Sequence, residues 1–284
     1  MSAASLTRIT SGGVALLHRE ASRGAQTLAL LHGIGSNAES FRPLIDALDP
    51  AFGIVAWDAP GYGDSIPLAP AWPDASDYAA VLAALLDRLD VPRAVILGHS
   101  LGALVAGRFA ATWPQRTALL VVVSPALGYQ ADPGQPLPAS VAKRLDDLDR
   151  LGPQAFAAAR APGLVSDPAA YPRALASVQA AMAAVKRPGY DQATRMLGSG
   201  DLLADMARII VPALVMTGDA DRLTPPDNAA RAFAALSATL PGIARTIPGG
   251  GHAVLQEQPQ PAAAFIAEAI ATMAATDPRI VNHV

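Results

Sequence analysis

The chain has 284 residues, a formal net charge of −3 and no cysteine, so its length fits one large domain, or one domain with a sizeable insertion. Hydrophobic residues make up 51% of the sequence and charged residues 16%, which supplies a large core and excludes a disordered chain. The mild acidity and the lack of a Lys/Arg cluster argue against nucleic acid as a partner, and the absence of cysteine excludes disulfides, thiol catalysis and zinc–thiolate sites.

Short apolar runs alternate with longer helical patterns along most of the chain. The runs that predict strands are Val14–His18, Thr27–Leu31, Gly53–Trp57, Ala94–Leu97, Leu119–Val123, Ala213–Thr217 and Ile243–Ile247. The patterns that predict helices between and after them are Ala38–Leu48, Tyr78–Leu89, Leu101–Thr112, Asn228–Ala238 and Pro261–Ala274. Because helices alternate with near-continuously apolar strands, we expect an α/β fold with a mostly parallel central sheet and helices on both faces.

One region breaks this alternation. Between Ala126 and Ile209 no segment reads as a strand, and the helical patterns there are Ala139–Leu151, Pro153–Arg160, Asp167–Val185 and Gly189–Met206. We therefore expect residues 1–125 and 210–284 to form the core and residues 126–209 to form an inserted helical cap above a sheet edge. A short polar end, Asp277–Val284, follows the last predicted helix.

The mean hydropathy of +0.29 raises the question of a membrane segment. The longest apolar runs, such as Ala118–Val123, are far shorter than the roughly 18 residues that a spanning helix needs. Met1–Thr7 lacks a basic segment followed by an apolar one. No signal peptide is therefore expected, and the cytoplasm is the predicted location.

The segment Gly-His-Ser-Leu-Gly, residues 98–102, joins a predicted strand directly to a predicted helix. This is the context in which G-x-S-x-G forms a strained turn that lifts a serine hydroxyl off the sheet edge. A Cβ at either flanking glycine would collide with the neighbouring strand or helix. The pattern predicts Ser100 as a nucleophile, and the alternative is a glycine-rich turn with an ordinary serine.

Serine needs a base at neutral pH. The histidines available are His18, His32, His99, His252 and His283. His252 follows a predicted strand on a glycine loop that allows free placement, so it is the best base, although a surface loop histidine is the alternative. His99 neighbours Ser100 along the chain, and we expect it to point away across the turn.

The base needs a carboxylate that orients it. Asp219 and Asp221 both follow the strand predicted at Ala213–Thr217. Either can equally be a turn former or a helix cap, the usual role of Asp beside Gly and Pro. Spacing alone leaves the two aspartates as alternatives.

A fourth segment, Leu-His-Gly-Ile-Gly at residues 31–35, follows another predicted strand. Glycines allow the backbone to approach a ligand closely, so the N–H of Ile34 can join that of Leu101 in an oxyanion hole. The alternative is a plain strand-to-loop turn. Residues 58–65 form a further Gly/Pro turn for which we expect a structural role.

These segments, in this order, resemble the α/β-hydrolase superfamily along nearly the whole chain. The resemblance implies the chain order Ser, Asp, His, and assigns the acid to Asp221, since related proteins place it three residues after the glycine, here Gly218. It also implies Ser100 and His252 as the other triad members, the N–H groups of Ile34 and Leu101 as oxyanion donors, and a helical cap.

Within the superfamily, a serine in the elbow speaks against haloalkane dehalogenases and epoxide hydrolases, which use Asp. Hydrolases of meta-cleavage products often carry Trp after the catalytic His, where this chain has Ala253. The remaining resemblance is to small carboxylesterases and enol-lactone hydrolases.

We therefore expect a serine hydrolase that cleaves a small, partly apolar ester or lactone, without metal or organic cofactor. Two alternatives stay open: hydrolysis of a carbon–carbon bond in a vinylogous diketone, and a non-catalytic ligand-binding protein on the same fold. The oligomeric state is not predicted, and a homodimer is among the options.

Overall fold

The computed structural model describes residues 4–238 and 240–276. Within these residues, eight strands form one sheet in the order β1-β2-β4-β3-β5-β6-β7-β8. They are β1 (Thr7–Ser11), β2 (Val14–Arg19), β3 (Thr27–Leu31), β4 (Gly53–Trp57), β5 (Ala94–His99), β6 (Thr117–Val123), β7 (Ala213–Gly218) and β8 (Gly242–Ile247). The pairs β1–β2 and β2–β4 are antiparallel, and the other neighbours are parallel.

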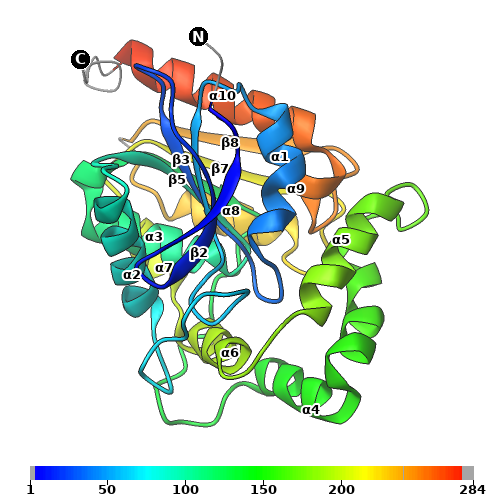
Figure 1. Cartoon of the computed structure of the whole chain (residues 1–284). Helices are drawn as coiled ribbons and strands as arrows, with labels where there is room; N and C mark the ends of the chain where they lie inside the picture. Colours follow the sequence, from blue (N-terminus) through cyan, green and yellow to red (C-terminus); the bar gives the residue numbers. More distant parts are fainter. Residues whose placement is uncertain (1–3, 239, 277–284) are drawn as a thin grey trace.

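Helices cover both faces of the sheet (Figure 1). Those of the core are α1 (Arg42–Ala47), α2 (Ala75–Arg88), α3 (Gly102–Thr112), α8 (Pro226–Ala234), α9 (Val254–Glu257) and α10 (Pro259–Thr276), with short 3-10 turns η1 (Ala38–Phe41) and η2 (Pro114–Arg116). Side chains of α1, α9 and α10 pack on one face of the sheet and those of α2, α3 and α8 on the other. The predicted α/β fold class is confirmed.

Strand β5 shows how the sequence makes two cores. Ala94 and Ile96 belong to the apolar cluster on the α2/α3 face, and Val95 and Leu97 to the cluster on the α1/α10 face. Successive side chains of a strand point to opposite faces, so a strand covered on both sides must be apolar at every position.

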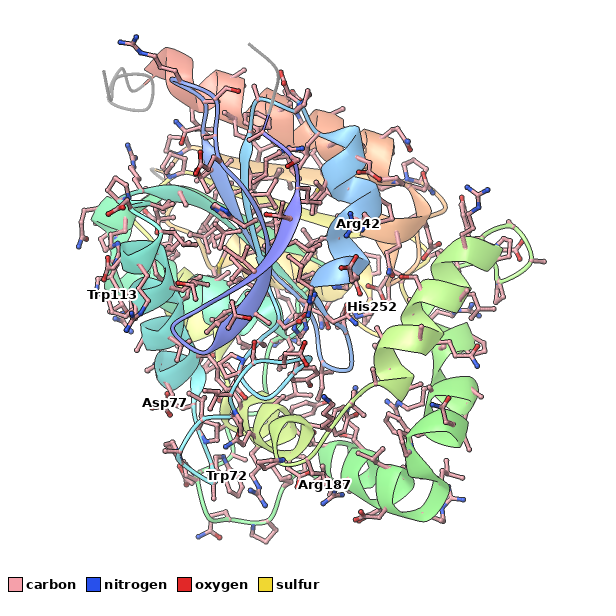
Figure 2. All side chains as sticks on the ribbon, viewed as in Figure 1. Arg42, Trp72, Asp77, Trp113, Arg187 and His252 are labelled. Atoms are coloured by element: carbon pink, nitrogen blue, oxygen red, sulfur yellow. The ribbon has the colours of Figure 1, made fainter. Side chains whose placement is uncertain are left out.

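A helical insertion, defined as residues 126–209, lies between β6 and β7. It contains α4 (Ala139–Arg160), η3 (Ala161–Leu164), α5 (Pro172–Ala183), α6 (Gly189–Ser199) and α7 (Leu202–Met206). No strand occurs in this described stretch, as expected from the sequence. Figure 2 shows the side chain of His252 between the core and the helices of the insertion.

Several helices of the structure begin, end or divide at other residues than the predicted ones. The segment Ala38–Leu48 forms η1 and then α1, with Pro43 in the first turn of the helix as its missing N–H favours. Under the label α4 lie the two predicted cap helices, residues 139–151 and 153–160, because Gly152 between them is non-helical with a positive φ of 70°. Gly200 adopts an extended conformation and separates α6 from α7.

Strand β1 was not predicted. Its sequence Thr-Arg-Ile-Thr-Ser has no apolar run, because it lies at the edge of the sheet and is largely exposed. The start of α5 at Pro172, later than the predicted Asp167, follows from the restriction of proline to the first helical turn. The predicted polar end, Asp277–Val284, lies outside the described residues.

Candidate active site

Ser100 occupies the sharp turn between β5 and α3. Its φ is +54°, a left-handed conformation that is uncommon for any residue but glycine, asparagine or aspartate. The backbone N–H of Ser100 donates a hydrogen bond of 2.9 Å to the carbonyl of Val123 at the end of β6, which ties the turn to the sheet. The strained backbone is thus held in place by its neighbouring strand.

The glycines that flank this turn have no room for a side chain. A Cβ at Gly98 would overlap the backbone of Gly102 and Ala103, and a Cβ at Gly102 would overlap the carbonyl of Leu31 in β3. The predicted collision with the neighbouring helix and strand is therefore present at both positions. Close contact of α3 with β5 and β3 is what makes the turn so tight.

His252 and Asp221 lie in contact. The Nδ1 atom of His252 is 2.9 Å from Oδ2 of Asp221, and both side chains are buried. The other carboxylate oxygen accepts hydrogen bonds of 2.9 Å from the backbone N–H groups of Leu223 and Thr224. If Nδ1 carries the proton toward this carboxylate, the Nε2 atom of His252 is left with a free lone pair.

Thr224 completes this cluster, and the sequence reasoning did not give it a role. Its Oγ1 lies 2.8 Å from Oδ2 of Asp221, 3.0 Å from Nδ1 of His252 and 2.9 Å from the carbonyl of Ser124. Burial alone would raise the pKa of Asp221, but hydrogen bonds and charge from His252 and hydrogen bonds from Thr224 lower it to about 2. The carboxylate is therefore ionised at neutral pH.

Asp219, the competing aspartate, lies elsewhere. It is exposed, and its Oδ1 accepts a hydrogen bond of 2.6 Å from the backbone N–H of Gly249. This contact holds the turn that precedes His252 rather than the imidazole itself. The structure thus brings Asp221, and not Asp219, to the histidine.

The loop after β3 lies directly against Ser100. A Cβ added to Gly33 would sit 2.9 Å from the Cβ of Ser100 and 3.4 Å from its Oγ. Within the described residues, neither the N–H of Ile34 nor that of Leu101 donates a hydrogen bond. Leu101 also precedes the first turn of α3, where the helix dipole favours negative charge. Two unpaired donors are therefore available beside the serine.

His32 and Tyr62 hold this loop in place. The Nε2 atom of His32 accepts a hydrogen bond of 3.0 Å from the N–H of Ala59, so its Nδ1–H donates to the carbonyl of Gly33 at 2.8 Å. Burial lowers the pKa of His32, in agreement with a neutral ring. The hydroxyl of Tyr62 accepts from the N–H of Gly35 at 3.4 Å. These contacts give the turn at residues 58–65 the structural role that we expected.

The side chain of His99 does not point away from the site as predicted. Its Nε2–H donates a hydrogen bond of 2.8 Å to the backbone carbonyl of His252, and the two ring centroids are 5.0 Å apart. Burial, followed by the nearby His252, lowers the pKa of His99 to about 3. The prediction was wrong because the end of β5 and the loop after β8, which are distant in sequence, meet at one edge of the sheet.

Two cavities open beside Ser100. The space in the first is about 500 Å³ and that in the second about 740 Å³, each including its open mouth. Ile34, Ser100, Arg144 and Leu223 line both of them, so the two spaces meet at the serine. His252 lines the first cavity and Leu101 the second. Ser100, His252, Ile34 and Leu101 therefore each line at least one of these two cavities, and Asp221 contacts His252 without lining either.

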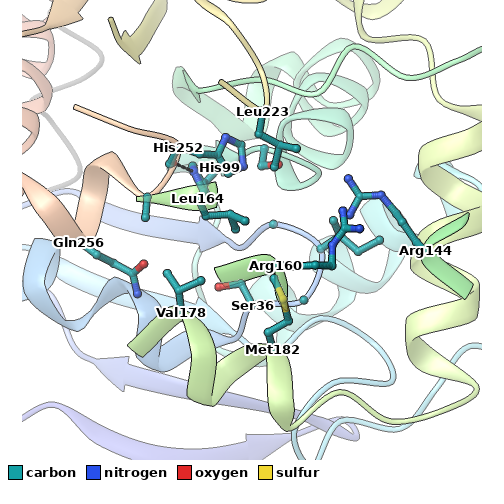
Figure 3. Close-up of a pocket in the computed structure, with 15 residues that line it drawn as sticks. Ser36, His99, Arg144, Arg160, Leu164, Val178, Met182, Leu223, His252 and Gln256 are labelled. Atoms are coloured by element: carbon teal, nitrogen blue, oxygen red, sulfur yellow. Dashed lines mark hydrogen bonds between the residues drawn. The ribbon is translucent and has the colours of Figure 1, made fainter. Parts of the chain in front are cut away.

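The helical insertion forms one wall of the first cavity. It contributes Leu164, Val178 and Met182, which are apolar, together with Arg144 and Arg160 (Figure 3). The sequence reasoning missed these arginines. A signal was present, since Val141, Arg144 and Leu148 are spaced three and four residues apart and thus share one helix face, whose flanking members are buried.

Among the described residues, no three His, Asp or Glu side chains gather closely enough to hold a metal ion. In the same part of the chain, every helix is too short or too polar to cross a bilayer.

Glu257 is a further buried carboxylate, but its Oε2 accepts hydrogen bonds from the N–H groups of Ser166 and Gly251. It ties the insertion to the loop that carries His252.

Comparison with known sequences places these features in a family context. The model described as the alpha/beta hydrolase family matches residues 28–265. A pimeloyl-[acyl-carrier protein] methyl ester esterase of Edwardsiella ictaluri is 31% identical over 266 residues, which is 89% of this chain and 96% of that protein. A 2-hydroxy-6-oxononadienedioate/2-hydroxy-6-oxononatrienedioate hydrolase of Pseudomonas putida is 31% identical over 140 residues, which is 47% of this chain and 48% of the relative's length.

Solved structures share the fold over nearly the whole chain. The enol-lactonase from Burkholderia xenovorans LB400 superposes with a TM-score of 0.81 at 20% identity, over 93% of this chain and 100% of that chain. A hydrolase from Pseudomonas aeruginosa PA01 superposes with a TM-score of 0.78 at 26% identity, over 94% of this chain and 98% of that chain. The relatives and neighbours named here thus include an esterase, a dienedioate hydrolase and an enol-lactonase.

Proposed function

This chain belongs to the alpha/beta hydrolase family, and we propose that it is a serine hydrolase that cleaves a small carboxylic ester or lactone through an acyl-Ser100 intermediate. One observation carries the proposal: Ser100, at a positive φ in the turn before α3, faces the same cavity as a histidine whose Nδ1 contacts a buried, ionised carboxylate. Serine, histidine and carboxylate in these relations form the arrangement that activates a hydroxyl for attack on an acyl group.

The first half of the reaction forms the acyl-enzyme. The Oγ–H proton of Ser100 passes to Nε2 of His252 as Oγ attacks the carbonyl carbon. The N–H groups of Ile34 and Leu101 hydrogen-bond the oxygen as it becomes negative, and Asp221 stabilises the imidazolium. When the intermediate collapses, the bond to the leaving oxygen breaks and His252 returns the proton to that oxygen.

The second half uses water in place of the leaving alcohol or enol. His252 takes a proton from the water while its oxygen attacks the acyl carbon. The second tetrahedral intermediate expels Ser100, which regains its proton from His252 and releases the acid. We assign residues 126–209 to a cap that closes over this space, because they supply the apolar wall of Leu164, Val178 and Met182.

A screen of substrates on the purified protein tests the reaction class. It should contain p-nitrophenyl esters, simple lactones and a vinylogous diketone acid, and we expect turnover of esters or lactones. Carbon–carbon bond hydrolysis is the second candidate, because one relative with 31% identity over 140 residues is a 2-hydroxy-6-oxononadienedioate hydrolase. Turnover of the diketone alone would favour that candidate over ester hydrolysis.

Covalent labelling tests the nucleophile and distinguishes an enzyme from a binding protein. A serine-directed phosphonate should modify Ser100, and the labelled peptide should contain residues 98–102. Ser36 is the internal control, since it lines the first cavity but does not occupy the strained turn. Absence of labelling in a folded protein, or labelling at Ser36, would contradict the proposed mechanism.

A further inference from the structure

The two cavities at Ser100 carry positive charge without a matching acid. Arg144 and Arg160 line the first cavity, and Arg144 and Arg231 line the second. No Asp or Glu is among the described residues that line either one. A cationic, partly enclosed space of this kind favours an anionic ligand, because the field is weakly screened there.

Arg160 is poorly neutralised by its own surroundings. Its Nε atom is buried and has no hydrogen-bond partner in the part of the chain that the structure describes. The carboxylate nearest to it, Asp147, lies 3.9 Å from Nη1 and is already paired with Lys143 at 2.9 Å and Arg150 at 3.0 Å. One carboxylate is thus shared among three cations, and its contact with Arg160 is the longest of the three.

Arg144 faces inward from the same helix. It does not take part in any ion pair of the described residues, and its guanidinium interacts with the buried hydroxyl of Tyr190. Figure 3 shows the guanidinium groups of Arg144 and Arg160 next to each other on the insertion side of the cavity. Burial and the positive charge of Arg144 lower the pKa of Arg160, as expected for two like charges in a confined space.

Two neighbouring guanidinium groups whose charge is incompletely paired attract a carboxylate, and the planar fork of donors on a guanidinium matches a carboxylate in geometry. We propose that the substrate carries a carboxylate besides its scissile ester or lactone, and that Arg144 and Arg160 bind this carboxylate while Ser100 attacks the acyl group. The proposal rests on the proposed serine-hydrolase function and deepens it, since it names the substrate class as half esters of dicarboxylic acids or lactones with an acidic side chain.

Matched pairs of substrates test the proposal. The charged members are the mono-p-nitrophenyl esters of succinic, glutaric and adipic acid, and each uncharged partner has the same chain length: butanoate, pentanoate or hexanoate. The quantity to compare is the ratio of kcat/KM for charged over uncharged ester, measured at pH of about 8, where the free carboxyl is ionised. A ratio cancels any general loss of activity or of folded protein.

Arg144→Gln and Arg160→Gln are each expected to lower this ratio about 10-fold to 100-fold for the best charged ester, the effect of losing a charge-assisted hydrogen bond. Arg144→Lys keeps the charge but loses the fork, and should fall between Arg144→Gln and the unmodified protein. Arg173→Gln is the control, because Arg173 is exposed on α5 and lines neither cavity; its ratio should stay within about twofold of that of the unmodified protein. An unchanged ratio in both arginine-to-glutamine variants, while the uncharged esters are still hydrolysed, overturns the carboxylate site and leaves the serine hydrolase intact.

Equilibrium binding separates this failure from failure of the proposed function. If no ester is hydrolysed by the unmodified protein, calorimetric titration of Ser100→Ala with adipate, glutarate and succinate tests the site without turnover. We expect binding of at least one dicarboxylate, weakened about tenfold or more when Arg144→Gln is added. Equal binding with and without Arg144→Gln, or no binding of any of the three, overturns the inference.

Discussion

The Nε2–H of His99 donates a hydrogen bond of 2.8 Å to the backbone carbonyl of His252. One histidine therefore positions the backbone of the other, and this contact requires a proton on Nε2 of His99. Burial and the neighbouring His252 lower the pKa of His99 to about 3, so the ring is neutral throughout the neutral pH range. His99 is a positioning residue in this arrangement, whereas His252 faces the serine's cavity.

This relation predicts a dependence of stability on pH. Between pH 6.5 and about 3 the unfolded chain binds a proton at His99 that the folded chain does not. The free energy of unfolding therefore rises with pH in this window, and it falls by up to about 1.4 kcal/mol for each pH unit as the pH is lowered. His99→Gln keeps an N–H donor but does not titrate. In urea unfolding at pH 6.5, 5.5 and 4.5, the free energy of unfolding should therefore fall less steeply with decreasing pH in this variant than in the unmodified protein.

The lowered pKa values of His18 and His32 act in the same direction, and they are common to both proteins in that comparison. Asp221 contributes only at lower pH, since its pKa is lowered to about 2. If the free energy of unfolding changes equally with pH in the two proteins, the ring of His99 becomes protonated as readily in the folded chain as in the unfolded chain.

The two aspartates after β7 should differ sharply in kinetic effect. Asp221→Asn places an amide against Nδ1 of His252, where it cannot stabilise the imidazolium and can favour the wrong tautomer, so kcat should fall by up to about 10⁴-fold. Asp219→Asn changes an exposed side chain that holds the N–H of Gly249, and its kcat should stay within about threefold. The kcat of both folded variants, measured in stopped assays, distinguishes the two aspartates. A larger loss of kcat in Asp219→Asn than in Asp221→Asn would identify Asp219 as the functional carboxylate.

Thr224 should matter through its hydroxyl rather than its volume. Thr224→Val removes an oxygen that contacts Asp221 and the carbonyl of Ser124 in a buried site. We expect a loss of about 1–3 kcal/mol in the free energy of unfolding and about a tenfold lower kcat, because the carboxylate is less firmly held. Thr224→Ser restores the hydroxyl and should recover most of the kcat. If serine does not rescue the rate while the valine variant remains fully stable, the hydroxyl is not what positions the carboxylate.

The apolar wall from α5 should control the preferred acyl length. Val178→Ala and Met182→Ala enlarge the first cavity, and each buried methylene is worth about 0.8 kcal/mol, or roughly fourfold. The ratio of kcat/KM for octanoate over butanoate esters should therefore rise several-fold in these variants. Leu175→Ala, on the same helix but outside the cavity lining, should leave the ratio unchanged. A uniform loss of kcat/KM on all esters would instead assign a structural role to this wall.

Ser100→Ala should remove the hydrolytic activity while the fold persists. The substitution deletes only Oγ, and the hydrogen bond from its backbone N–H to Val123 is retained. Without the nucleophile, only the residual rate from binding and the oxyanion donors is left. A folded variant that retained more than about a hundredth of the original kcat would require another nucleophile.

Local sequence determined much of the fold because burial on both sheet faces imposes an apolar residue at every strand position. Five of the strands in the described residues, β3 to β7, were recognised in this way, from the apolar run at residues 28–31 to that at residues 214–216. The turn at Ser100 was recognised for a similarly local reason, since glycines at 98 and 102 are required by contacts with α3 and β3. Strand β1 escaped recognition because an exposed edge strand needs no apolar run.

Only the tertiary structure decided which side chains meet. Asp219 and Asp221 are two residues apart and equally suited to a turn, so their spacing leaves them as alternatives. Asp221 contacts His252 because the loop after β7 and the loop after β8 lie next to each other in the folded chain, whereas Asp219 contacts Gly249. The same holds for His99 and for Arg144, whose partners lie on segments distant in sequence. Residue type and spacing predict the local backbone conformation of a segment, whereas contacts at the edge of the sheet depend on the path of the whole chain.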